Sequence, residues 1–270
     1  MKKLFTFLLS LVLLLSLCPA ALADVIVEPE DNFFKQHSDA CLRENRGYYT
    51  NGGKGYVIGF AAPEGSGKVV FPNGTRFVIS WTYSDGDKLW GLMEYSAETL
   101  QPGYGEESCW VNLSEMLLDY DSESFMAEHA AQLVEESVQV LIPDYQSEMI
   151  CWAYPGSTTV KYTIGGHANT IDFYQTYTDS LGRKWGYCGY WRAHRQFWVC
   201  LDDPFNQELS VGEEHVDTLS QLIPAADEAT MEAALKGAKA PNYTLLFGAV
   251  GVVVIAGALL VYVLRKKKKA

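Results

Sequence analysis

Residues 82–95 read TYSDGDKLWGLMEY and residues 176–190 read TYTDSLGRKWGYCGY, so one pattern occurs twice in the chain. Each copy closes with a second tryptophan, in Cys109-Trp110-Val111 and in Phe197-Trp198-Val199. The copies lie about 90 residues apart, a spacing that predicts two tandem structural units rather than a long array of short repeats.

Alternating apolar residues lead into each copy. The alternation runs through residues 77–83 and, interrupted by Gln175, through residues 171–177. A period of two predicts β-strands. Turn residues such as Pro72-Asn73-Gly74 and Gly165-Gly166 separate these segments. Several short strands divided by such turns predict a small all-β barrel in each copy.

Each copy resembles a bacterial Src-homology-3-like domain of the extracellular type. The resemblance rests on a turn-rich first half, on a Trp-Gly-x-x-x-Tyr strand (Trp90–Tyr95 and Trp185–Tyr190) and on the closing Trp-Val pair. It covers roughly residues 48–113 and 149–204, and the first copy departs from it by an insertion at residues 96–108 that could cover or extend a groove. The chain as a whole resembles membrane-anchored surface proteins of gut Firmicutes. The resemblance implies an all-β fold of two small Src-homology-3-like barrels in tandem, with a short linking helix and one C-terminal transmembrane helix.

The two ends of the chain carry membrane signals. Lys2 and Lys3, an apolar run and Ala21-Leu22-Ala23 are typical of a secretory signal peptide over residues 1–23. Residues 244–264 lack charges and are numerous enough to span a bilayer as a helix. The basic run Arg265–Lys269 places the following tail in the cytoplasm. We therefore expect a single-pass protein of the cell membrane whose N-terminal domain is extracellular.

The middle of the chain contains two further predicted segments. Met126, Ala130, Leu133, Val134 and Val138 recur at helical spacing and predict a helix over residues 121–138. A polar stretch after Pro204 predicts a stalk, flexible or helical from Asp227 to Lys236. The predicted order is a signal peptide (1–23), a first unit with an N-terminal lead (24–120), a helical linker (121–147), a second unit (148–204), the stalk (205–242), the transmembrane helix (243–264) and the tail (265–270).

Five cysteines remain once Cys18 leaves with the signal peptide. Export places them where disulfides can persist, and their odd number leaves at least one unpaired or joins two chains. Cys41 and Cys109 are the first candidate pair. Cys188 and Cys200 flank a predicted hairpin and could pair across it, with Cys151 as the competing partner. Buried, reduced thiols are the alternative for all five.

Charge and motifs limit the possible functions. Without the basic residues of its two ends, the chain carries 14 basic and 33 acidic residues, a net charge of −19. This charge argues against nucleic acid and anionic polymers as partners. The sequence contains no His-Glu-x-x-His, Cys-x-x-Cys, Gly-x-Ser-x-Gly or phosphate-loop motif, and no block outside the two units is long enough for a peptidase domain. We expect no enzyme activity, no metal and no cofactor.

Aromatic residues are the candidate binding residues, because small barrels can bind extended peptides in aromatic grooves. The same side chains could equally form the cores of the units. The candidates are Tyr49, Trp81, Tyr83, Trp90, Tyr95, Trp110, Trp152, Tyr177, Trp185, Tyr190, Trp191 and Trp198. The expected function is a non-enzymatic extracellular binding module for cell-wall peptide or a neighbouring surface or membrane protein. The alternatives are an accessory or sensor subunit of a membrane complex and, less favoured, a thiol-active or cell-wall hydrolytic enzyme.

Overall fold

The computed structural model describes residues 28–103, 107–166, 168–190 and 195–239. The predicted signal peptide, transmembrane helix and basic tail lie outside these residues. Within them, no helix combines the length and apolarity needed to cross a bilayer. The described chain forms two antiparallel sheets and three α-helices, which confirms the prediction of a mostly β protein.

The first unit comprises one helix and a seven-stranded sheet with the strand order β3-β2-β6-β5-β4-β1-β7. A 3-10 turn, Leu113–Glu115, precedes the last strand. The elements are α2 (Asn32–His37), β1 (Cys41–Thr50), β2 (Tyr56–Phe60), β3 (Gly67–Pro72), β4 (Arg76–Ser84), β5 (Leu89–Tyr95), β6 (Glu107–Asn112) and β7 (Met116–Leu118).

The second unit repeats this arrangement in a six-stranded sheet with the order β10-β9-β13-β12-β11-β8. Element by element, α3 corresponds to α2 and β8–β13 correspond to β1–β6, whereas β7 has no counterpart among the described residues. The elements are α3 (Ser122–Glu128), β8 (Val134–Ile142), β9 (Met149–Trp152), β10 (Val160–Ile164), β11 (Asn169–Thr178), β12 (Lys184–Tyr190) and β13 (Arg195–Cys200).

The repeat extends to the strand register. In the first unit the β1–β4 pairing is shifted between Arg43 and Arg46, and Asn45 within this bulge has a left-handed φ of 56°. In the second unit the β8–β11 pairing is shifted at the corresponding place, between Phe173 and Gln175. A bulge bends its strand, so both sheets bend at the same position.

Each sheet packs a core on both faces. In the first unit, one face carries the cluster around Phe71, Phe77 and Ile79, and the other face packs Trp90 and Trp110 under α2. The second unit has the same division, with clusters centred on Phe173 and Phe197 and on Trp185 and Trp198 under α3. Within the described residues, no hydrogen-bonded pair of edge strands closes either sheet into a barrel.

The predicted helix over residues 121–138 is wrong beyond its first half. Helix α3 ends at Glu128, and residues 134–142 form strand β8, which pairs with β11. Val134 and Val138 fit a helical spacing as well as a strand, but β-branched side chains favour a strand when a sheet offers a pairing edge. The segment 121–147 is therefore part of the second unit rather than a linker, and the second unit begins before residue 148.

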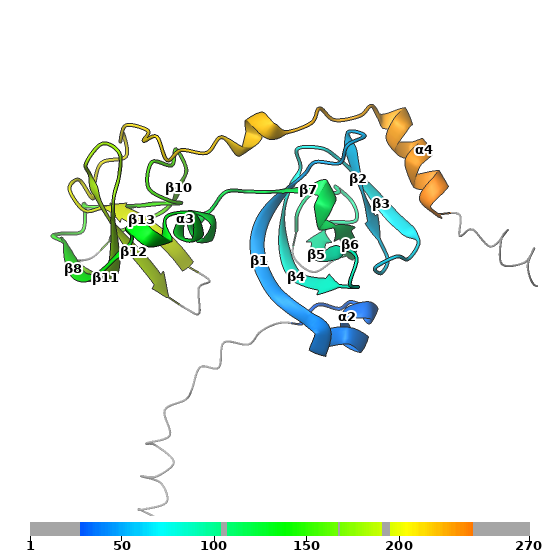
Figure 1. Cartoon of the computed structure of the whole chain (residues 1–270), viewed down its shortest axis with the longest axis horizontal. Helices are drawn as coiled ribbons and strands as arrows, with labels where there is room; N and C mark the ends of the chain where they lie inside the picture. Colours follow the sequence, from blue (N-terminus) through cyan, green and yellow to red (C-terminus); the bar gives the residue numbers. More distant parts are fainter. Residues whose placement is uncertain (1–27, 104–106, 167, 191–194, 240–270) are drawn as a thin grey trace, which may run out of the picture.

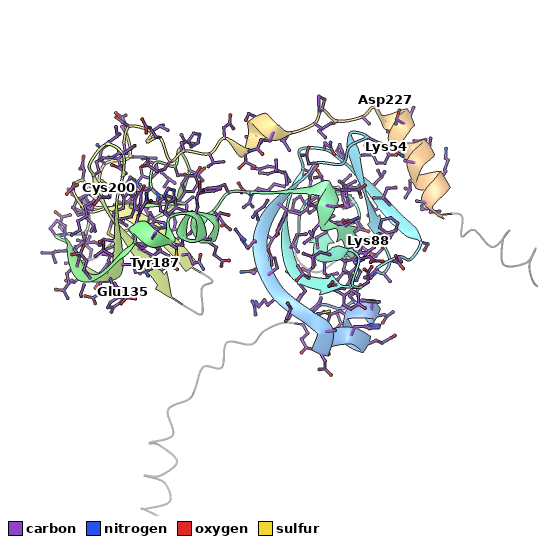
Figure 2. The ribbon with its side chains drawn as sticks, viewed as in Figure 1. Lys54, Lys88, Glu135, Tyr187, Cys200 and Asp227 are labelled. Atoms are coloured by element: carbon purple, nitrogen blue, oxygen red, sulfur yellow. The ribbon has the colours of Figure 1, made fainter. Side chains whose placement is uncertain are left out.

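The C-terminal segment, predicted to be a stalk, contacts both units. Residues 205–226, here called the strap, run along both units (Figure 1). The Tyr154 hydroxyl hydrogen-bonds to the backbone of Val216 in the second unit, and the Ala226 amide donates to Gly55 in the first. Asp227, at the end of the strap, and Lys54 lie on the same side of the first unit (Figure 2).

Helix α4 (Glu228–Lys239) follows the strap and agrees with the predicted helix over residues 227–236. It lies against β3, where a Cβ atom added at Gly67 would approach the Ala238 side chain to 2.5 Å. The glycine therefore allows the helix and the strand to approach each other closely.

An ion pair joins the two units directly. The Arg46 guanidinium on β1 donates to both carboxylate oxygens of Asp121, at 2.9 and 2.6 Å, and to the hydroxyl of Ser124. Asp121 also caps α3, because its carboxylate accepts from the Ser124 amide. The side chains of Arg46 and Asp121 are largely buried. This contact and the strap fix the second unit against the first.

Candidate functional site

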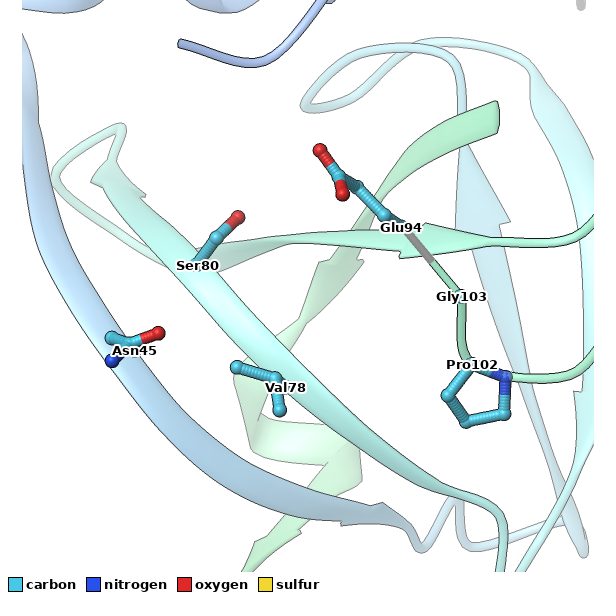
Figure 3. Close-up of a pocket in the computed structure, with 6 residues that line it drawn as sticks. All are labelled: Asn45, Val78, Ser80, Glu94, Pro102 and Gly103. Carbon is cyan, nitrogen blue, oxygen red and sulfur yellow. The ribbon is translucent and has the colours of Figure 1, made fainter. Parts of the chain in front are cut away.

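The first candidate site is a groove on the face of β1, β4 and β5 that carries Val78 and Ser80. It has a volume of about 220 Å³ and is mainly apolar. Figure 3 shows Asn45 and Pro102 on opposite sides of Val78, with Ser80 and Glu94 beside them. We call this the first groove, lined by Asn45, Val78, Ser80, Glu94, Pro102 and Gly103.

Strand alternation and the bulge position the lining of the first groove. Val78 and Ser80 alternate along β4 with the buried Phe77 and Ile79, so they face away from that core. Val78 is 44% exposed, and the Ser80 hydroxyl donates to the carbonyl of Leu92 at 3.1 Å. The groove therefore has an apolar floor with polar groups around it, as small-ligand sites commonly have.

The insertion at residues 96–108 supplies one wall of this groove. Pro102 forms a β-bridge with Tyr95, and the Ser96 amide donates to the Gln101 carbonyl at 2.9 Å. These contacts turn the described part of the insertion back onto the sheet and bring Pro102 beside Val78. The insertion thus extends a groove, one of the two roles expected for it.

A second groove in the second unit overlaps this position in part, since Ile171, Cys188 and Phe197 of its lining belong to the core on the other face of the sheet. The register of β11 and β12 puts Asp172, Tyr174 and Gly189 at the positions of Val78, Ser80 and Glu94. All three line a groove of about 550 Å³. Its full described lining, here the second groove, is Tyr162, Thr163, Ile164, Gly165, Asn169, Thr170, Ile171, Asp172, Tyr174, Cys188, Gly189 and Phe197.

Each groove contains one carboxylate, but at a different position. Glu94 on β5 supplies it in the first groove, and Asp172 on β11 supplies it in the second. Asp172 accepts a 2.6 Å hydrogen bond from the Gln139 side chain of β8. Tyr174, which is 67% exposed, adds an aromatic surface. Each groove therefore combines apolar surface with one acidic side chain.

Most of the predicted aromatic binding residues are core residues. Tyr49, Trp81 and Tyr83 are half-buried, whereas Trp191 and the side chain of Tyr190 lie outside the described residues. Seven of the twelve are buried and cannot contact a ligand in this structure, namely Trp90, Tyr95, Trp110, Trp152, Tyr177, Trp185 and Trp198. The prediction is wrong for these seven, because a small sheet with a core on each face needs large side chains on both.

The buried tryptophans hold the repeat together through their indole nitrogens. Trp90 Nε1 donates to Asp85 at 2.8 Å, and Trp185 Nε1 donates to Asp179 at 2.9 Å. Both acids lie in the turn before the strand that carries the tryptophan. The repeated Asp and Trp of the sequence therefore form a hydrogen bond that joins a turn to the strand that follows it.

A second repeated cluster joins each helix to its sheet. In the first unit, Phe33 stacks on His37 and meets Tyr83 and Trp110 edge to face. The corresponding rings of the second unit, Phe125, His129, Tyr177 and Trp198, make the same contacts. The Phe-x-x-x-His pattern at residues 33–37 and 125–129 was a sequence signal for this cluster that our prediction missed.

The five cysteines among the described residues are free thiols, so none of the proposed disulfides forms in this structure. Cys41 and Cys109 belong to different cores, on opposite faces of the sheet. Across the β12–β13 hairpin, Cys188 faces Phe197 and Cys200 faces Trp185, so these two cysteines do not oppose each other. Burial raises the pKa of every one of these thiols, that of Cys151 to about 12.

In the part of the chain that the structure describes, no three His, Cys, Asp or Glu side chains gather as a metal site would need. His37 lies four residues before Cys41 in the chain, and its Nδ1 lies 2.9 Å from the Phe33 carbonyl oxygen. No protein-family model, curated protein or solved structure matches the chain.

Proposed function

We propose that the chain is a non-enzymatic extracellular binding module, anchored in the membrane by its C-terminal helix, that recognises cell-wall peptide or a surface protein. The observation that supports this most is that each of the two tandem units has a groove, and that the two grooves share three equivalent lining positions. The first groove and the second groove lie in different units and carry different side chains. One extended ligand can therefore contact both grooves.

We also assign each unit to the Src-homology-3-like class. The run β7-β1-β4-β5-β6 in the first unit supports this assignment, since three meandering strands are followed by a 3-10 turn and a short strand that returns to β1. The second unit has the same meander, β11-β12-β13, and the same pairing of its first strand, β8, with β11.

The expected ligand is a peptide that carries an amino group beside small apolar side chains, as cell-wall peptides do. Glu94 and Asp172 offer one carboxylate to each groove, and Val78 and Ile171 offer apolar surface. The strongly acidic extracellular part attracts cations and repels anionic polymers. Because the Arg46–Asp121 ion pair fixes the units, binding at one groove raises the effective concentration of ligand at the other.

Retention of the purified full chain on peptidoglycan at low salt tests the proposal. We expect Glu94→Gln and Asp172→Asn to weaken retention singly, and the double variant to weaken it further. Glu208→Gln is the matched control, because it removes the same charge from an exposed position that lines neither groove. Absence of retention of the unmodified chain would reject cell-wall peptide as the ligand. Crosslinking in membranes that recovers one defined partner would instead support the accessory-subunit alternative.

A further inference from the structure

The two units differ at one edge of their sheets. In the first unit, β7 pairs with the outer edge of β1, joining Leu118 to Tyr48 and Met116 to Thr50. In the second unit, β8 is the last strand of its sheet, and no described strand pairs with its outer edge. Backbone groups along such an edge are ready to bind another strand.

The repeat identifies which residues of β8 lie along the edge that has no described strand partner. The common register of β1 with β4 and of β8 with β11 places Val140, Leu141 and Ile142 at the positions of Tyr48, Tyr49 and Thr50. Leu141 is 62% exposed. The stretch Val138–Ile142 contains no charged residue and is rich in β-branched side chains, which favour strand pairing. Proteins commonly protect edges with lysine, proline or a bulge. Here the bulge of β8 and Pro143 lie just outside the two ends of the stretch, and the stretch itself contains none of these features.

The first unit also indicates what covers such an edge. Its β7 is a short antiparallel strand with three apolar residues, and Asp119, directly after it, pairs with Arg76 of β4 at 2.8 Å. In the second unit Thr170 occupies the position of Arg76, so this cation is replaced by a neutral residue. Instead, the carboxylates of Glu135 and Asp144 lie near the two ends of the uncovered stretch. Figure 2 labels Glu135 on the second unit.

We propose that the outer edge of β8, at Val138–Ile142, binds an antiparallel strand of a partner polypeptide that has an apolar centre and basic flanks. This surface is separate from the two grooves. A second copy of the chain fits the charges poorly, because an antiparallel pair of β8 strands brings the acidic end of each strand, with Glu135, near Asp144 of the other. Like charges placed opposite each other destabilise a strand pair.

The probe is a fluorescent peptide with the sequence of residues 113–120 in which lysine replaces Glu115 and Asp119. We expect saturable binding to the purified full chain at low salt, and at least tenfold weaker binding to the Leu141→Lys variant. Leu219→Lys, which changes another exposed leucine, is the matched control and retains binding. The unmodified acidic peptide binds at least fivefold more weakly than the lysine peptide. Equal binding of the two peptides would reject the proposal that the partner strand has basic flanks.

Peptides N-methylated at alternate residues test whether the contact is strand pairing. In an antiparallel pair, alternate amides of the probe face the neighbouring strand. One methylated set therefore abolishes binding and the other leaves it intact, whereas an equal effect of both sets would reject strand addition. If the full chain dimerises in a concentration-dependent way and Leu141→Lys abolishes the dimer, the ligand of this edge is a second copy of the chain. That result would reject a different polypeptide as the partner. Peptide binding that persists without retention on peptidoglycan, or the reverse, shows that one proposal has failed and not the other.

Discussion

The indole nitrogen of Trp198 donates a 2.9 Å hydrogen bond to the hydroxyl of Ser122, 76 residues earlier in the chain. Trp110 makes the corresponding bond to Asp31, at 3.1 Å and across 79 residues. In each unit the closing strand therefore holds the first turn of the leading helix. Since both contacts recur, helix, strand and tryptophan belong to one repeated unit of about 90 residues.

Replacing Ser122 by alanine leaves the buried indole N–H of Trp198 without its acceptor. An unsatisfied buried donor costs about 1–3 kcal/mol, so we expect the free energy of unfolding to fall by that amount. Chemical denaturation followed by tryptophan fluorescence measures it. Ser114→Ala is the control, because Ser114 is exposed. Equal stability of the Ser122 and Ser114 variants would show that the hydrogen bond contributes nothing.

Asp31→Ala removes three interactions at once, one of them a hydrogen bond donated by the Ser108 hydroxyl at 3.1 Å. Asp31 accepts from Trp110 and also caps α2 by accepting from the Phe34 amide at 2.8 Å. A lost cap adds roughly 0.5–2 kcal/mol to the cost of the unsatisfied indole. We therefore expect a larger loss of stability than for Ser122→Ala. Asp31→Asn keeps an acceptor oxygen, so its free energy of unfolding should lie close to that of the unmodified chain. If Asp31→Asn is as unstable as Asp31→Ala, this explanation is contradicted.

The sequence predicted the duplication, the mostly β character and helix α4, because repeated tryptophans, alternation and an Ala/Glu-rich segment are local signals. It did not predict that residues 134–142 form an edge strand, since Val134 and Val138 satisfy two periodicities and only the β11 edge decides between them. The sequence did not predict either groove. Val78 and Asp172 become groove residues through the register of three strands, which connects positions far apart in the chain.

The ion pair between the units predicts a measurable coupling. Arg46→Met and Asp121→Asn each remove the bidentate contact, and neighbouring residues of this kind couple by about 0.5–3 kcal/mol in a double-mutant cycle. We expect the single variants to broaden the calorimetric transition or split it, because the units then unfold less cooperatively. A coupling energy near zero, with one sharp transition in every variant, would show that the strap alone joins the units.

Acid should weaken the same contact. Burial alone raises the pKa of Asp121, but its hydrogen bonds from Arg46 and from the Ser124 amide outweigh burial and lower that pKa below the ordinary value. A carboxyl with a lowered pKa contributes stability that is complete above its unfolded pKa of about 3.9 and is lost as the pH falls through the folded pKa. Between neutral pH and pH 3, Asp121→Asn should therefore lose less stability than the unmodified chain. Parallel pH profiles would contradict the prediction.

The thiols should react slowly in the folded protein. Burial raises the pKa of all five described cysteines, and the thiolate is the reactive form. With a maleimide at neutral pH, we expect Cys188, the half-exposed thiol, to label first and the four buried thiols only after denaturation. Peptide mass spectrometry identifies the labelled site. Rapid labelling of a buried cysteine would revive the thiol-active alternative.

The seating of α4 on β3 determines where mechanical load enters the protein. A force applied at the C-terminal end of α4 acts first on the contact between Ala238 and Gly67. The helix must peel away from β3 before tension reaches the strap and, through Tyr154, the second unit. The first unit therefore bears the load first, and the second unit with its groove and unpaired edge is shielded until α4 and the bonds of the strap to Asn51 and Gly55 have detached.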